Sequence, residues 1–128
     1  MRFTLEKDEK LKSKKLIELL FAKGSRVKSF PLQLIYLKKE HYSECPIKVG
    51  FVVPKRVVHL AVNRNRIKRM MREVYRKNKQ FFSENLTGKY IFMFIYMTKD
   101  ETKYDDLELS IKKVCDKFLL KIKDDEQN

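Results

Sequence analysis

The segment 61–78 reads Ala61-Val-Asn-Arg-Asn-Arg-Ile-Lys-Arg-Met-Met-Arg-Glu-Val-Tyr-Arg-Lys-Asn78. Its apolar residues recur at i, i+3, i+4 and i+7, which is typical of a helix that packs on a core along one stripe. At about 100° per residue, a separate arc of the same helix, about 140° wide, is cationic. The stripe consists of Ile67, Met70, Met71 and Val74, and the arc of Arg64, Asn65, Lys68, Arg69, Arg72 and Arg76.

The charge pattern of this arc differs from that of an ordinary solvated helix face. Solvated faces mix charges of both signs, because like charges at i and i+4 repel each other. Four cations of the arc follow one another at that spacing, and Glu73 lies just beyond its edge. From Lys55 to Lys79 there are ten Lys and Arg residues against one Glu. We interpret the arc as a surface for phosphate groups, where Arg supplies forked donors and Asn65 bonds a sugar or base edge.

The overall composition supports a polyanionic partner. The chain has 128 residues, which favours one domain over residues 1–128, and 43% of them are hydrophobic, enough for a core. The net charge is +13 at pH 7. Residues 99–128 hold seven basic and nine acidic residues, so the positive excess lies in the N-terminal and central parts.

Several other function classes find no support in the sequence. The apolar run from Ile91 to Met97 is too short to cross a bilayer, and the N-terminus resembles no signal peptide, so we expect a cytoplasmic protein. Cys45 and Cys115 have no CxxC spacing and are predicted to be reduced, partly buried thiols. His41 and His59 lack partners at zinc-ligand spacing, and we assign them no role.

The N-terminal part is predicted to contain an arm and a short helix. Residues 1–12 form an extended arm pinned by Phe3, Leu5 and Leu11. A helix over 14–23 follows, with Ser13 as its N-cap and Gly24 as its C′ residue.

Two strands are expected next, over 30–37 and 47–53, and their polar connection predicts an antiparallel hairpin. In the first strand, alternation divides the side chains between two faces. One face carries Leu32, Leu34 and Tyr36, and the other carries Gln33 and Ile35.

The C-terminal part is predicted to supply a central strand and a last helix. Residues 79–89, with Phe81 and Phe82, are expected to connect the basic helix to a strand over 90–97. That strand is almost wholly apolar, which is typical of a strand covered on both faces. It is expected to run parallel to the strand over 47–53, across the basic helix.

A final helix over 106–121 is expected to begin with a capping box of Asp105 and Glu108, before a frayed tail at 123–128. The order α-β-β-α-β-α predicts an α+β fold, a single-domain sandwich of a small mixed sheet and helices.

Two motifs give this chain a resemblance to a known family. Val49-Gly-Phe-Val-Val-Pro-Lys-Arg56 precedes Ala61-Val-Asn-Arg-Asn-Arg-Ile-Lys-Arg69 and then Arg72-Glu73. Together they resemble the signature of the protein subunit of bacterial ribonuclease P. The Arg-Asn-Arg block is specific in this setting, and nearly the whole chain has the element order of that family.

The resemblance implies a fold with an unusual left-handed βαβ crossover around the basic helix. It implies a protein that binds the catalytic RNA subunit and helps it remove the 5′ leader of precursor tRNA. The chemistry would belong to the RNA and its Mg²⁺ ions, with no cofactor on the protein and no obligate protein partner. The residues implied to contact RNA are Lys55, Arg56, Arg64, Asn65, Arg66, Lys68, Arg69, Arg72 and, by its place on the same face, Arg76.

The resemblance also implies a cleft for the single-stranded leader, lined by the first helix and one face of the sheet. Phe21 matches an aromatic of that helix, and Ile17 stands where the family has a second Phe. The family's strand tyrosine falls at Ile35 or Tyr36, and we assign Tyr36 to the cleft. Aromatic side chains in such a cleft would stack on bases.

Three alternative functions compete with this interpretation. A nuclease acting through its own side chains would need clustered carboxylates or a His pair, and Asp105, Asp106 and Glu108 suit the start of a helix instead. A helix-turn-helix DNA-binding protein would place a helix, not a strand, before its basic helix. A general RNA-binding or ribosome-associated basic protein remains the alternative that composition alone leaves open.

Overall fold

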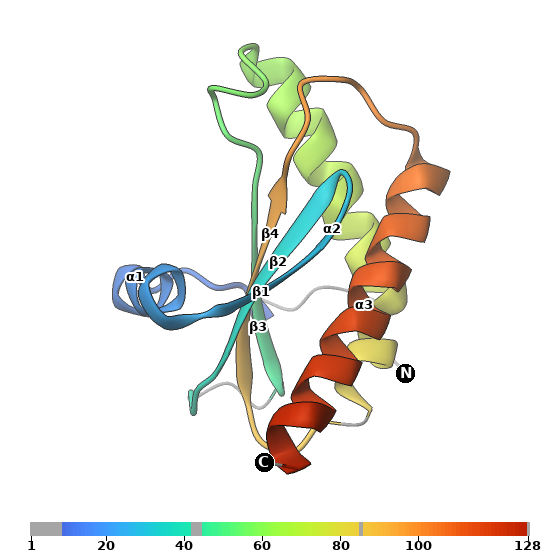
Figure 1. The fold of residues 1–128 in the computed structure, drawn as a ribbon. Helices are drawn as coiled ribbons and strands as arrows, with labels where there is room; N and C mark the ends of the chain where they lie inside the picture. The colour runs from blue at the N-terminus through green and yellow to red at the C-terminus, as the bar shows by residue number, and fades with distance from the viewer. Residues whose placement is uncertain (1–8, 42–44, 85, 128) are drawn as a thin grey trace.

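The sheet of this protein has four strands, and the central strand β4 (Tyr90–Tyr96) is buried along its whole length. The computed structural model describes residues 9–41, 45–84 and 86–127. The strand order is β1-β2-β4-β3, and three helices pack on the sheet (Figure 1). The predicted α+β sandwich is therefore confirmed. The other elements are α1 (Lys14–Lys23), β1 (Ser25–Ser29), β2 (Leu32–Lys38), β3 (Ile47–Val52), α2 (Ala61–Ser83) and α3 (Tyr104–Gln127).

The strand pairing confirms one prediction and overturns another. β3 runs parallel to β4 with α2 between them in the chain, as predicted. β2 and β3 do not form the predicted hairpin, because β4 lies between them and pairs with both. The hairpin partner of β2 is β1, which the sequence analysis missed because only Val27 of β1 is buried.

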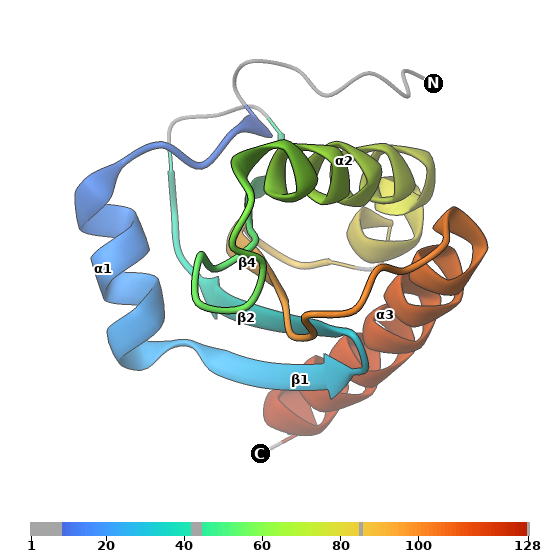
Figure 2. The ribbon, with the colours of Figure 1, turned by 90° about the horizontal axis from the view of Figure 1, so that it is seen from above.

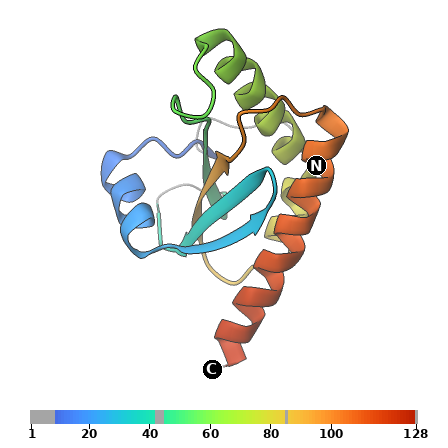
Figure 3. The ribbon, with the colours of Figure 1, turned by 45° about the horizontal axis from the view of Figure 1, so that its top comes forward.

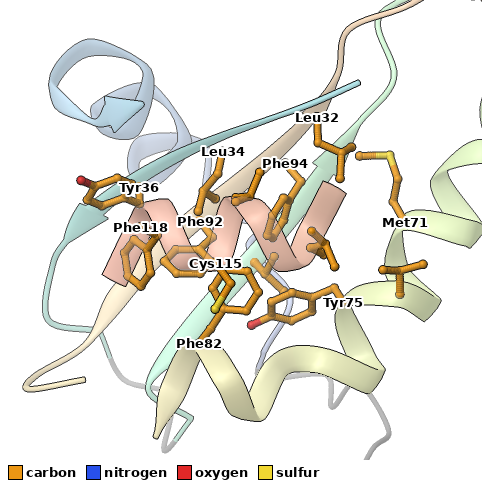
Figure 4. Packing of buried hydrophobic residues seen from close by; sticks show 14 of the residues in the cluster. Leu32, Leu34, Tyr36, Met71, Tyr75, Phe82, Phe92, Phe94, Cys115 and Phe118 are labelled. Carbon is orange, nitrogen blue, oxygen red and sulfur yellow. The ribbon is translucent and has the colours of Figure 1, made fainter. Parts of the chain in front are cut away.

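The two faces of the sheet carry two separate cores. α2 and α3 cover one face, and α1 covers the other (Figures 1 and 2). The larger core lies under α2 and α3 and is rich in aromatic rings (Figure 4). The smaller core lies under α1 and consists of Leu11, Leu20, Ile35, Ile91, Met93 and Ile95.

The predicted ends of α1 are confirmed, with a different reason for the glycine. Ser13 caps the helix, since its side chain accepts a hydrogen bond from the backbone N–H of Leu16 at 3.3 Å. Gly24 has a φ of −70°, so no left-handed conformation requires it. A Cβ at Gly24 would lie 2.5 Å from the carbonyl oxygen of Leu20 and 2.7 Å from Cγ2 of Ile35. The close approach of α1 to β2 therefore requires this glycine.

Both long helices extend beyond their predicted limits. α2 continues to Ser83, so Phe81 and Phe82 belong to the helix and not to a connector. α3 already begins at Tyr104, so the predicted capping box was wrong and Asp105 lies in the first turn, where an acid suits the helix dipole. α3 also runs to Gln127, so the predicted frayed tail is helical up to that residue.

The residues before α1 close the outer edge of β3. The backbone N–H of Leu11 donates to the carbonyl oxygen of Val49 at 2.9 Å, and Lys10 forms a parallel bridge to the same strand. Glu9 and Lys79 form a largely buried ion pair of 2.9 Å, which ties this segment to α2. Leu11 is thus one of the predicted anchors of the arm, while Phe3 and Leu5 lie outside the described residues.

Both cysteines are free, and Cys115 is buried in the larger core. Burial raises the pKa of Cys115 to about 12 from the ordinary value of 9.0. The folded state therefore holds this proton more tightly, and the stabilisation is present below pH 9 and lost as the pH rises toward 12. We expect the free energy of unfolding to fall by up to about 1.4 kcal/mol per pH unit from this group alone. Urea titrations at several alkaline pH values should show a smaller fall in Cys115→Ala, and identical slopes would contradict the assignment.

Among the described residues, no helix combines the length and the apolar character that a membrane span requires.

Candidate nucleic-acid interface

The basic arc of α2 lies opposite the stripe that anchors this helix. Ile67, Met71 and Val74 are buried in the larger core, as the periodicity predicts, and Met70 packs against them partly buried. Asn65, Arg69 and Arg72 are exposed, and Lys68 is half-buried. The core contacts of the stripe therefore fix the direction in which these polar side chains project.

Arg64 has a structural contact in addition to its place in the arc. Its Nη1 donates to the carbonyl oxygens of Val58 at 3.1 Å and His59 at 2.7 Å. Because Val58 is itself buried in the core, this contact holds the loop that precedes α2. Lys55 and Arg56 are exposed on that same loop.

The N-terminal end of α2 adds to the positive potential of this region. No side chain caps the first turn of α2, and that turn contains no acid. Its backbone N–H groups are therefore open to an anion, and the helix dipole places partial positive charge at this end. Figure 1 shows the loop that carries Lys55 and Arg56 at this end of the helix.

Two arginines of the predicted set are paired with acids. Arg66 donates to Glu101, which lies in the loop between β4 and α3. Arg76 pairs with Glu73 three residues earlier, and this hydrogen bond lowers the pKa of Glu73. Both pairs are partly exposed, and such pairs contribute little to stability, so a phosphate group can displace the acid.

A groove beside α2 is lined by cations from two distant parts of the chain. It has a volume of about 200 Å³, and Lys68 and Arg72 of α2 line it. Lys10 and Lys12 line it as well, together with Gly50 and Phe51 of β3. In the sequence, the sign of this groove is the pair of lysines on either side of Leu11. The bridge from Lys10 to β3 is the contact that brings these lysines to α2.

The predicted leader-cleft residues do not all lie on one face of the sheet. Ile17 packs on the smaller core, and Phe21 on the same helix is 43% exposed. Tyr36 was wrongly assigned to this cleft, because it is 4% exposed and packs edge-on against Phe118 of α3 on the opposite face. Ile35 and Leu37 are β2 residues on the face toward α1, as strand alternation requires.

The histidine and acidic side chains that could take part in catalysis lie in ordinary structural positions. In the described parts of the chain, no three His, Cys, Asp or Glu side chains gather in a cluster that could hold a metal ion. His41 contacts the carbonyl oxygen of Tyr90 at 3.2 Å through Nε2, and burial lowers the pKa of this imidazole. Asp105 and Asp106 lie in the first turn of α3.

Comparison with known proteins gives one consistent family. The family model described as Ribonuclease P matches residues 5–119. A ribonuclease P protein component of Porphyromonas gingivalis is 31% identical over 121 residues, which cover 94% of this chain and 87% of that protein. The corresponding protein of Chlorobaculum tepidum is 40% identical over 85 residues, 64% of this chain, and the match spans only 55% of its own length.

Solved structures show the same fold. The RNase P protein of Staphylococcus aureus superposes with a TM-score of 0.65 at 22% identity, covering 83% of this chain and 91% of that one. The RNase P protein of Thermotoga maritima superposes with a TM-score of 0.67 at 19% identity, covering 84% and 94% of the two chains.

Proposed function

The chain belongs to the family of ribonuclease P protein components, and on that premise we propose that it binds the catalytic RNA subunit and the 5′ leader of precursor tRNA. In this role it assists the endonucleolytic cleavage that gives mature tRNA 5′ ends in the cytoplasm. The observation that carries the proposal is the concentration of cations on α2 and the groove beside it, on a helix whose opposite stripe is buried.

The two ends of α2 differ in what they offer to RNA. Near its N-terminus, the uncapped first turn and the exposed side chains of Lys55, Arg56 and Asn65 provide donors for phosphates and sugars. Farther along, Lys68, Arg72, Lys10 and Lys12 line one groove, and these four cations suit the phosphates of an RNA backbone. RNA would displace Glu101 from Arg66 and gain that cation as a further contact.

We assign the leader to the α1 face of the sheet. Phe21 offers a half-exposed ring for stacking on a base, and Ile17 supplies an apolar neighbour in place of a second ring. The protein would act by holding and orienting RNA. Magnesium ions would supply the chemistry of phosphodiester hydrolysis, and we assign them to the RNA partner.

A cleavage assay with three arms tests this function. Precursor tRNA is incubated at low magnesium concentration with a bacterial ribonuclease P RNA alone, with RNA and this protein, or with this protein alone. Stimulation only where RNA and protein are both present is the expected result. Cleavage by the protein alone would overturn the assignment of catalysis to the RNA. No effect in any arm, with folded protein and cognate RNA, would favour the alternative of a general basic RNA-binding protein.

The leader assignment predicts a selective effect of Phe21→Ala. We expect binding of precursor tRNA by the holoenzyme to weaken about tenfold, because one base loses its stacking partner, while binding of mature tRNA stays unchanged. Because Phe21 is 43% exposed, the variant should fold, and circular dichroism checks this. Equal losses for precursor and mature tRNA would remove Phe21 from the leader site.

A further inference from the structure

The short segment before α1, residues 9–12, supplies two of the cations that line the groove beside α2. Burial alternates along this segment. Glu9 and Leu11 are 5% and 7% exposed, whereas Lys10 and Lys12 are exposed. Figures 2 and 3 show the segment, in blue, leading from the side of β3 to α1. Two buried residues therefore fix the direction in which the two lysines project.

The two buried residues are held by different parts of the molecule. Leu11 belongs to the smaller core, and its backbone N–H donates to the carbonyl oxygen of Val49 at 2.9 Å. Glu9 reaches α2, where its Oε1 accepts a hydrogen bond from Nζ of Lys79 at 2.9 Å. Leu11 thus sets the position of the segment on the sheet, and Glu9 sets its position against the basic helix.

The ion pair between Glu9 and Lys79 is shielded from water. The side chain of Glu9 is 6% exposed and that of Lys79 is 16% exposed. Taking two charges out of water costs free energy that their attraction only partly recovers, so an apolar pair would stabilise the fold at least as well. Removing one member of such a pair is nevertheless costly, because it leaves a buried charge that is no longer neutralised. Stability alone therefore does not account for this pair, whereas a precise position of the segment does.

The pair also has no direct electrostatic role in the groove. An exposed carboxylate next to Lys10 would repel phosphates, but Glu9 is buried and Lys79 neutralises it. Lys79 is not among the residues that line the groove. It lines a separate cavity of about 120 Å³, together with Glu9 and Tyr75. The pair can therefore affect RNA binding chiefly through the position of the lysines that follow Glu9.

We propose that Glu9 is a positioning residue for RNA binding: its ion pair with Lys79 holds Lys10 and Lys12 beside the cations of α2 and so assembles the groove, a role that rests on the proposed function. Within the described part of the chain, the segment has an isolated bridge to β3 in place of a full strand pairing. Its position therefore depends on its side-chain anchors, and loss of the ion pair would let the two lysines move away from α2.

Two single substitutions test this role, because they change the net charge in opposite directions. Glu9→Gln makes the protein more positive, and Lys79→Gln makes it less positive. A general electrostatic effect would strengthen RNA binding in the first variant and weaken it in the second. Loss of positioning should weaken binding of the ribonuclease P RNA about tenfold in both. The slope of log affinity against log salt should also become shallower by about 1.4 to 1.8, as expected when two cations leave the phosphates.

The matched control for the change in charge is Glu18→Gln, which removes an exposed acid from α1. This variant should bind the ribonuclease P RNA at least as tightly as the wild type, with an unchanged salt slope. Tighter binding by Glu9→Gln, as in a simple removal of negative charge, would overturn the proposal.

A variant without the two lysines tests whether Glu9 acts through them. Lys10→Gln with Lys12→Gln should itself weaken binding about tenfold. Adding Glu9→Gln should then cause no further loss, because residues that act through one another have non-additive effects. A further tenfold loss in the triple variant would mean that Glu9 acts on the fold as a whole, and would overturn the proposal.

Amide hydrogen exchange of the full chain reports the position of the segment without RNA. Because the N–H of Leu11 is bonded to Val49, its exchange should be at least about tenfold faster in Glu9→Gln. The amides of β4 should keep their wild-type rates, which shows that the fold is intact. Unchanged protection of Leu11 in Glu9→Gln would contradict a positioning role.

The cleavage assay separates this role from the proposed function. If the wild type does not stimulate cleavage of precursor tRNA, but Glu9→Gln still weakens RNA binding with a shallower salt slope, the positioning role stands and the role in tRNA maturation is rejected. If the wild type stimulates cleavage and Glu9→Gln does so at the same protein concentrations, the role in tRNA maturation stands and the positioning role is rejected.

Discussion

Replacing Arg69 and Arg72 together with glutamine is expected to weaken binding of the ribonuclease P RNA about a hundredfold. Both side chains are exposed on the basic arc of α2, and Arg72 also lines the groove that contains Lys10 and Lys12. A hydrogen bond to a charged group is worth at least about 1.5 kcal/mol, so two lost contacts cost about 3 kcal/mol. Since about 1.4 kcal/mol corresponds to a factor of ten, the expected loss is two orders of magnitude.

The salt dependence of binding distinguishes direct contacts from a general loss of charge. If both arginines contact phosphates, the slope of log affinity against log salt should become shallower by about 1.4 to 1.8. Filter binding at several salt concentrations measures both quantities. The matched control is Lys113→Gln with Lys123→Gln, two exposed lysines of α3, which changes the net charge equally and leaves α2 intact. An unchanged slope in Arg69→Gln with Arg72→Gln would remove the α2 arc from the interface.

The choice of these two arginines follows from contacts that only the structure supplies. Arg64 also holds the loop before α2 through two carbonyl groups, so its removal would mix loss of structure with loss of binding. Arg66 and Arg76 have acidic partners, and their removal would release Glu101 or Glu73. Within the described part of the chain, no hydrogen bond or ion pair is found for the side chains of Arg69 and Arg72, and their loss should report on RNA alone.

The spacing of apolar residues over short stretches of sequence predicted much of the fold. The spacing of Ile67, Met71 and Val74 fixed which side of α2 is buried, and therefore which side is basic. The continuous apolar run of β4 predicted a strand covered on both faces, because no polar residue in it requires contact with water. Both inferences depend only on local geometry, which the sequence carries in full.

Features that depend on contacts between distant residues could not be predicted. β1 has one buried residue and looks like a loop until β2 and the lysines of α3 satisfy its backbone. The hairpin prediction failed because adjacency in the chain favoured β2 with β3, whereas β4 uses both of its edges. The assignment of Tyr36 to the leader cleft failed because a shift of one residue in a strand moves a side chain to the opposite face of the sheet.

Phe82→Ala is expected to reduce the free energy of unfolding by about 4 kcal/mol, the usual cost of removing a large ring from a core. Phe82 is fully buried, and its ring centroid lies 5.6 Å from that of Phe92 and 6.0 Å from that of Phe118 (Figure 4). It therefore joins the last turns of α2 to both β4 and α3. A domain of this size is stable by about 5–15 kcal/mol, so the loss would be a large share of the total.

The neighbouring residue gives the matched control for this prediction. Phe81 lies in the same helical turn and is 53% exposed, so Phe81→Ala should cost less than about 1 kcal/mol. Urea unfolding followed by circular dichroism measures both variants, and equal costs would mean that α2 does not continue through Phe82 as a packed helix. The basic arc depends on the same packing, since α2 presents its cations only while its opposite stripe is held against the sheet. RNA binding by Phe82→Ala should therefore fail at temperatures where the variant unfolds and recover on cooling, whereas Arg69→Gln with Arg72→Gln should bind weakly at every temperature.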